Sequence, residues 1–199
     1  MSEYGFPGAT ALGLIYKDGV MLVADRRASY GTFVLSKNAR KIFRVSERIG
    51  IVSAGFISDM QTLVREARYN ANMFRLHNNR EMNARALAKF MSNALFSSRT
   101  APLMTQTIVA GFDKGEKSVI VLDALGSLIE DRYTAVGSGS EVALGVLEAD
   151  YKENMTYEEA KDLIVRTVKA ALARDSASGN GIDLLVIDEK GTREEFISI

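Results

Sequence analysis

The chain is organised around the sequence GATALGL at residues 8–14, which is followed by IYKDGVMLVADRRAS at residues 15–29. Both runs are mainly apolar, and the Lys17-Asp18-Gly19 turn between them is a strong hairpin signal because glycine tolerates positive φ. The stretch therefore predicts two antiparallel strands, the second of which ends in the charged cluster Asp25-Arg26-Arg27. A hairpin implies no chemistry by itself, so function depends on what lies at its two ends.

Length and composition limit the classes of function to consider. The chain has 199 residues, 47% apolar and 25% charged, as in a single globular domain with a substantial core. Lysine and arginine total 25, as do aspartate and glutamate, so the zero net charge favours neither nucleic acid nor a membrane surface as a partner. The absence of cysteine excludes disulfides, thiolate chemistry and cysteine-ligated metal sites.

The apolar runs bear on where the protein works. Residues 1–8 lack the apolar core of a signal peptide. No run approaches the roughly 18 apolar residues that span a bilayer. We therefore expect a cytoplasmic protein with no membrane partner.

Changes in apolar spacing divide the chain into blocks. Spacings of three and four, typical of amphipathic helices, occur over residues 56–77, 82–97, 141–150 and 157–172. Short runs typical of strands occupy residues 32–36, 41–45, 48–55, 105–112, 118–122, 127–129, 133–136, 182–187 and 193–197. Ser58-Asp59 is expected to cap the first helix. The order predicts an α+β fold in which two antiparallel sheets pack face to face, each with a helix pair on its outer side.

Residue types alone leave several candidate sites open. His77 is the sole histidine; it could join a catalytic triad, but at a predicted helix end it is more often a solvated cap. One histidine and no cysteine give no His/Cys metal cluster, and we expect no metal and no cofactor. Gly137-Ser138-Gly139-Ser140 could cradle a phosphate at a helix N-terminus, but it lacks the lysine of a P-loop, so a turn with a helix cap is the simpler interpretation.

Two other polar groups are ambiguous on spacing alone. Residues 174–183 place charged and hydroxyl side chains in a loop, either as a solvated turn or as part of a site. Asp25 could cap a turn while Lys41 extends its charge to solvent. Alternatively, Asp25 could hold the Lys41 ammonium beside a nucleophile, whose pKa the cation would lower. The pattern does not choose between these alternatives.

Taken together, these segments resemble a proteasome β subunit of the archaeal type, and hence an N-terminal-nucleophile hydrolase. The resemblance covers the chain from Gly8 onward. Its motifs are LGL at 12–14, KDGV at 17–20, ADRRAS at 24–29, residues 37–41, SAG at 53–55, GFD at 111–113, GSGS at 137–140 and RDSASGNG at 174–181. Their order and spacing make the match specific, although no single motif would.

The resemblance implies a four-layer αββα sandwich, which agrees with the block order. It implies peptide-bond hydrolysis in which an N-terminal threonine hydroxyl attacks, the free α-amine accepts the proton, and an ester intermediate is hydrolysed. It also implies that residues 1–8 are a propeptide cut between Gly8 and Ala9, and that residues 9–199 form one catalytic domain.

The resemblance further assigns roles to residues of this sequence. Lys41 would lower the proton affinity beside the nucleophile, with Asp25 paired to it, and the Gly55 N–H would lie in the oxyanion hole. The residues implied to orient the amine and hydroxyl are Ser138, Asp175 and Ser178. The residues implied to line the pocket before the cut are Ala28, Ala39, Phe43, Ser53 and Ile57, which predicts a preference for hydrophobic residues there.

The chain departs from the family pattern at the nucleophile. The family has threonine after the glycine that ends the propeptide, whereas Gly8 is followed here by Ala9. Asp25 and Lys41 follow Ala9 by 16 and 32 residues, the family's own spacings, so Ala9 occupies the nucleophile position. Thr10 lies one residue later, and on a strand its side chain points to the opposite face. Because a methyl group cannot attack a carbonyl, we expect loss of peptide hydrolysis and of self-cleavage, with residues 1–8 retained.

Several alternatives to a silenced enzyme remain at this point. The main one is a naturally non-catalytic structural or assembly β-type subunit of the same particle. An α subunit would need an additional N-terminal helix, which residues 1–8, with Pro7 and two glycines, do not supply. The bacterial two-ring protease of the same fold is shorter, and a phosphate-binding module at residues 137–140 is the remaining candidate.

The resemblance also implies partners. These are other β subunits in a seven-membered ring, a second β ring and rings of α subunits. Helices that begin near Phe56 and Glu141 are candidates for the ring contacts. Unfolded polypeptides would be the substrates, with an ATP-dependent unfoldase as an indirect partner and no nucleic acid.

Overall fold

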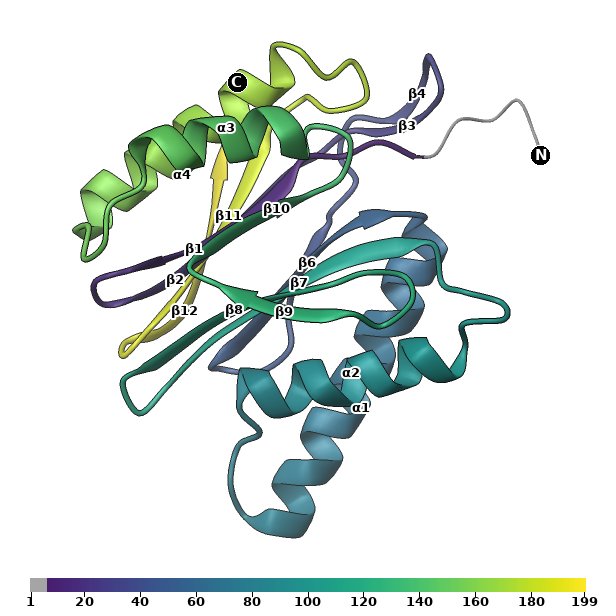
Figure 1. The fold of residues 1–199 in the computed structure, drawn as a ribbon, viewed down its shortest axis with the longest axis vertical. Helices are drawn as coiled ribbons and strands as arrows, with labels where there is room; N and C mark the ends of the chain where they lie inside the picture. The colour runs from purple at the N-terminus through teal and green to yellow at the C-terminus, as the bar shows by residue number, and fades with distance from the viewer. Residues whose placement is uncertain (1–6) are drawn as a thin grey trace.

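The computed structural model describes residues 7–199, which form twelve strands and four helices (Figure 1). The strands are β1 (Ala11–Tyr16), β2 (Gly19–Asp25), β3 (Ala28–Tyr30), β4 (Phe33–Ser36), β5 (Ile42–Arg44), β6 (Ile49–Gly55), β7 (Thr105–Asp113), β8 (Glu116–Leu122), β9 (Leu128–Asp131), β10 (Tyr133–Val136), β11 (Ile182–Asp188) and β12 (Gly191–Ile197). The helices are α1 (Ile57–Asn78), α2 (Ala84–Ser97), α3 (Ser140–Asp150) and α4 (Tyr157–Leu172). None of these helices has the length and apolar character needed to cross a membrane.

Two five-stranded antiparallel sheets pack face to face. Their strand orders are β10-β1-β2-β11-β12 and β5-β6-β7-β8-β9, and β3 and β4 form a separate two-stranded ribbon. Helices α3 and α4 cover the outer face of the first sheet, and α1 and α2 cover the outer face of the second (Figure 1). The predicted α+β sandwich of four layers is therefore confirmed.

Strand β2 shows how the sequence produces this layering. Side chains alternate between the two faces of a strand. Met21 and Val23 accordingly lie in the core beneath α3 and α4, whereas Val20, Leu22 and Ala24 lie in the core between the two sheets. Because both faces are covered, every residue of β2 is buried, which explains its uninterrupted apolar sequence.

The first hairpin has the predicted form and places the N-terminal segment beside the charged cluster. Ala11 pairs with Ala24, and one step further along the Asp25 N–H donates to the Thr10 carbonyl at 3.1 Å. Strand β11 pairs with the other edge of β2, with Ile182 opposite Asp25. The end of β2 is therefore the point where Ala9, Asp25 and the loop before β11 meet.

The predicted cap of the first helix is wrong. The helix begins at Ile57, so Asp59 lies inside its first turn. There its carboxylate accepts a hydrogen bond from the Met104 N–H at 2.8 Å, in the segment that leads into β7. A carboxylate in the first turn is favoured by the helix dipole, and here it also fastens a neighbouring loop.

The other end of β1 and β11 is held by a partly buried polar cluster. The Tyr16 hydroxyl donates to Asp188 Oδ2 at 3.0 Å, and the two terminal nitrogens of Arg193 donate to the same carboxylate at 3.0 and 2.7 Å. The Arg193 hydrogen bonds hold the pKa of Asp188 below its ordinary value, and burial raises the pKa of Tyr16. The cluster lines a cavity of about 1050 Å³, but its polar groups already satisfy one another.

We predict that Asp188→Asn destabilises the chain by about 1.5–3 kcal/mol at pH 7, because it removes the charge that Arg193 and Tyr16 bind. A folded-state pKa below the unfolded value of about 3.9 means that this stabilisation is present above that pH and is lost as the pH falls through the lowered pKa. Urea unfolding of both chains from pH 7 to pH 3 should show the difference shrinking with acid.

Asp162→Asn is the matched control, because Asp162 makes an exposed pair with Arg166. A difference between the Asp188→Asn and parent chains that is the same at pH 3 and pH 7 would contradict the assigned role of the charge.

Candidate active site

A single buried carboxylate organises the site at the end of β2. Asp25 is fully buried, and its Oδ1 accepts from the Thr10 N–H at 2.9 Å and from Lys41 Nζ at 2.6 Å. Its Oδ2 accepts from the N–H groups of Arg27 and Gly179, both at 2.9 Å. Four donors from four segments therefore compensate one buried negative charge.

Lys41 lies just before β5 and is 2% exposed. Besides Asp25, its ammonium donates to the Arg27 carbonyl at 2.6 Å. Burial lowers the pKa of Lys41, and the attraction of Asp25 opposes that shift. Of the two alternatives left open by the sequence, the one in which Lys41 extends into solvent is wrong.

Two hydroxyl groups and a carboxylate meet beside Ala9. Ser138 precedes α3, and its Oγ accepts from the Ala9 N–H at 3.1 Å while donating to Asp175 Oδ2 at 2.6 Å. Ser178 donates to the same Asp175 oxygen at 2.6 Å. The structure thus brings together three of the predicted residues from loops that lie far apart in the sequence.

Thr10 and Ala9 direct their side chains to different sides of the segment, although the Thr10 hydroxyl still contacts Ser178 of this cluster. That hydroxyl is fully buried and hydrogen bonds Ser178 Oγ at 2.8 Å. Ala9 is 1% exposed, and its side chain belongs to the core between the two sheets. The alternation of a strand therefore separates the two side chains as predicted.

Gly55 ends β6 between two cavities that flank Gly8. It has φ of +130°, and a Cβ at this position would lie 2.2 Å from the Met104 carbonyl oxygen. A cavity of about 370 Å³ lies on one side, lined in part by Gln106, Leu125 and Ser138. A second cavity of about 10 Å³ lies on the other side and is lined in part by Ala28, Tyr30, Lys41, Ile57 and Met60.

Not all residues of the predicted pocket reach this second cavity. Ala28 and Ile57 do, but Ser53 is fully buried with its Oγ hydrogen bonded to Thr107 Oγ1 at 3.0 Å. Phe43 packs against the core beneath α1 and α2, and the Ala39 N–H donates to the Arg26 carbonyl at 2.8 Å.

The residues of this cavity that sequence reasoning did not assign to the site include Arg27, Ser29, Tyr30 and Met60. Met60 follows Ile57 by three positions on the predicted apolar helix face, so helical spacing could have identified it. Tyr30 lies on β3, which was not predicted as a separate strand, and no local signal points to it.

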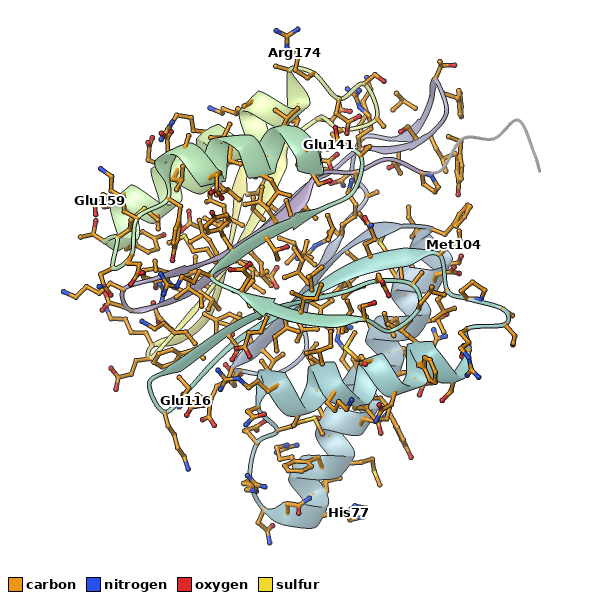
Figure 2. The ribbon with its side chains drawn as sticks, viewed as in Figure 1. His77, Met104, Glu116, Glu141, Glu159 and Arg174 are labelled. Atoms are coloured by element: carbon orange, nitrogen blue, oxygen red, sulfur yellow. The ribbon has the colours of Figure 1, made fainter. Side chains whose placement is uncertain are left out.

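The other candidates lie elsewhere or have no metal-binding arrangement. Figure 2 shows His77 at the far end of α1, whereas Glu141 and Arg174, which adjoin the two site loops, lie on the opposite side of the molecule. Residues 7–199 contain no group of three or more His, Cys, Asp or Glu side chains that could hold a metal ion.

Comparison with known proteins decides the family. Residues 6–187 match the protein family described as "Proteasome subunit". The chain belongs to the proteasome subunit family. It is 45% identical to "Proteasome subunit beta 2" of Pyrobaculum calidifontis over 199 residues, covering 100% of this chain and 98% of that protein. It is 46% identical to "Proteasome subunit beta 1" of Ignicoccus hospitalis over 181 residues, covering 91% of each chain.

These relatives identify the chain as a proteasome β subunit of the core particle. Membership of this family implies assembly into the rings of the core particle together with α subunits, and a family chemistry of threonine-type proteolysis. The two-sheet, four-helix sandwich is consistent with the N-terminal-nucleophile hydrolase fold.

For this proteasome β subunit we predict that Asp25→Ala costs about 3–5 kcal/mol of stability, because it leaves the Lys41 charge buried without a partner. Lys41→Met should cost a similar amount, because it leaves the buried Asp25 carboxylate without its cation. The double variant should be much less destabilised than the sum of the two, as measured by denaturant unfolding. Additive effects would show that the two charges do not depend on each other.

We further predict that Gly55→Ala lowers the midpoint of thermal unfolding by about 6–12 °C, equivalent to about 3 kcal/mol in a chain of this size. The cause is the combination of a positive φ with a close backbone contact. Gly115→Ala is the control that measures the cost of positive φ without a close contact. Gly115 has φ of +87°, and nothing lies within 4 Å of the added carbon. Equal losses in both variants would exclude the contact with Met104 as a cause.

Proposed function

We propose that this proteasome β subunit is a threonine-type endopeptidase that is silenced at its nucleophile position and retains residues 1–8. One observation carries the proposal: the Ala9 nitrogen is held by Ser138 Oγ at 3.1 Å, beside an intact Asp25–Lys41 pair, while residue 9 has only a methyl group. This arrangement supports the proposal, because these groups could serve a hydroxyl at residue 9 and alanine does not supply one. Residues 1–6 of the propeptide lie outside the described residues; Pro7 and Gly8 line both cavities at the site.

The proposal gives each remaining group a role. With a hydroxyl at residue 9, Lys41 would stabilise the developing alkoxide, and Asp25 would keep Lys41 oriented. The Gly55 N–H would stabilise charge on the carbonyl oxygen. Ser138, held by Asp175, would orient the nitrogen of residue 9, which must be a free amine to accept the proton. While Gly8 remains attached, that nitrogen is an amide and cannot act as the base.

The small cavity supports a preference for apolar residues before the cut. Ala28, Ile57 and Met60 supply apolar walls. A volume of about 10 Å³ holds about one water molecule, so a larger side chain would enter only as Met60 or Tyr30 moves. Methionine has a flexible side chain that adapts to such changes.

We also propose the arrangement of partners. The β subunits would form a seven-membered ring stacked on a second β ring and flanked by α rings, and unfolded polypeptides delivered by an ATP-dependent unfoldase would be the substrates. Tyr69 and Leu76 of α1 are 61% and 64% exposed, and Leu144 of α3 is 38% exposed. These apolar side chains support α1 and α3 as the helices that contact neighbouring subunits.

The test is to restore the hydroxyl. In particles assembled with α subunits, Ala9→Thr should raise peptide hydrolysis by a factor on the order of 10⁶. The intact mass should fall by that of the segment ending at Gly8. Ala9→Val is the matched control, because valine has the shape of threonine without its hydroxyl, and it should remain inactive and unprocessed. Inactivity of Ala9→Thr in a fully assembled particle would favour the alternative, a naturally non-catalytic structural or assembly subunit.

A further inference from the structure

The loop at residues 175–181 carries two groups of the proposed site but has no regular secondary structure of its own. Asp175 Oδ2 accepts hydrogen bonds from Ser138 Oγ and from Ser178 Oγ, both at 2.6 Å, and both bonds require the loop to stay in place. Figure 1 shows this yellow-green loop beside β3 and β4, and the Ser29 hydroxyl of β3 donates to the Ala177 carbonyl at 3.1 Å. The position of the loop is therefore set by the segment that follows β2.

The side chain of Arg27 makes the most extensive of these contacts. Its Nε donates to Asn180 Oδ1 at 2.9 Å, and its Nη1 donates to the Ser176 carbonyl at 2.7 Å. The guanidinium also lies against Gly179, where an added Cβ would be 2.4 Å from Nη2 and 2.6 Å from Cζ. One planar group thus contacts the loop on both sides of Ser178.

The backbone of Arg27 is part of the charged centre. Its N–H donates to Asp25 Oδ2 at 2.9 Å, and its carbonyl accepts from Lys41 Nζ at 2.6 Å. The loop is joined to the same centre through the Gly179 N–H, which donates to Asp25 Oδ2. Arg27 therefore connects the Asp25–Lys41 pair with the Asp175–Ser178 loop through one residue.

We propose that Arg27 is a positioning residue, whose guanidinium fixes the 175–181 loop so that Asp175 and Ser178 keep their bonds beside residue 9. This inference rests on the proposed function and names a residue that the resemblance did not assign. Arg27 contacts no reacting atom and acts through the loop. Arginine suits this task because its rigid fork directs two hydrogen bonds at once, whereas lysine offers a point charge on a flexible chain.

The first experiment uses the chain with Ala9 and does not depend on activity. Amide hydrogen exchange should be faster in peptides that cover residues 175–181 of Arg27→Lys than in the parent chain, with β1, β2 and β11 unchanged. Gly179→Ala should have the same effect, because its methyl group would displace the guanidinium while leaving Arg27 in the sequence. Arg68→Lys is the matched control, since Arg68 lies on α1, away from the loop, and makes two hydrogen bonds to the Arg44 carbonyl of β5.

The second experiment repeats the substitution in Ala9→Thr particles assembled with α subunits. Arg27→Lys should lower kcat for a short peptide by about 10²-fold, as expected when catalytic groups shift by about 1 Å. This loss should exceed any change in KM, which can also shift because Arg27 lines the small cavity. Unchanged exchange in the 175–181 loop would overturn the proposal whatever the activity. Faster exchange with an unchanged kcat would also overturn it, because the loop would then move without affecting the reaction. If Ala9→Thr is itself inactive, the proposed function fails, and the exchange result still decides whether Arg27 fixes the loop.

Discussion

The fold and the candidate site depend on the same buried charge. Asp25 has no contact with solvent, and a carboxylate in that position is tolerated only when donors surround it. The donors come from the segment before β1, from the segment between β2 and β3, from the residue just before β5 and from the loop before β11. These segments can satisfy the charge only when both sheets are correctly assembled. Correct folding and correct arrangement of the site are therefore one requirement.

The local features of the fold were predictable because their signals are local. The apolar alternation and the Lys17-Asp18-Gly19 turn defined the first hairpin, and spacings of three and four defined four helices whose ends lie within two residues of those predicted. The same reasoning placed Thr10 on the face opposite residue 9, whose methyl group lies in the core between the two sheets. In each case the deciding residues are neighbours in the sequence.

The arrangement of the site was less accessible, because it depends on contacts between distant segments. Spacing alone could not pair Lys41 with Asp25, and the pairing followed only from the resemblance. Tyr30 gave no signal, and Arg27 stood out only as part of the charged cluster at residues 25–27, with no role predicted for it, since each acts through partners on other elements. Asp59 was misassigned for a related reason: a cap was the obvious local role, but its carboxylate serves the distant Met104. Pairing between β2 and β11 joins residues more than a hundred positions apart, which periodicity cannot specify.

Residue 9 is fixed mainly through its backbone. Its N–H donates to Ser138 Oγ, and its carbonyl accepts from the Gly139 N–H at 3.3 Å. Its side chain adds only a methyl group to the inter-sheet core. Codons for threonine and alanine differ in their first base alone. One transition in the gene therefore exchanges the two residues without removing any of the backbone contacts that hold this position. Natural selection for a well-folded chain has little effect on such a change, and only selection for the reaction itself can maintain a hydroxyl here.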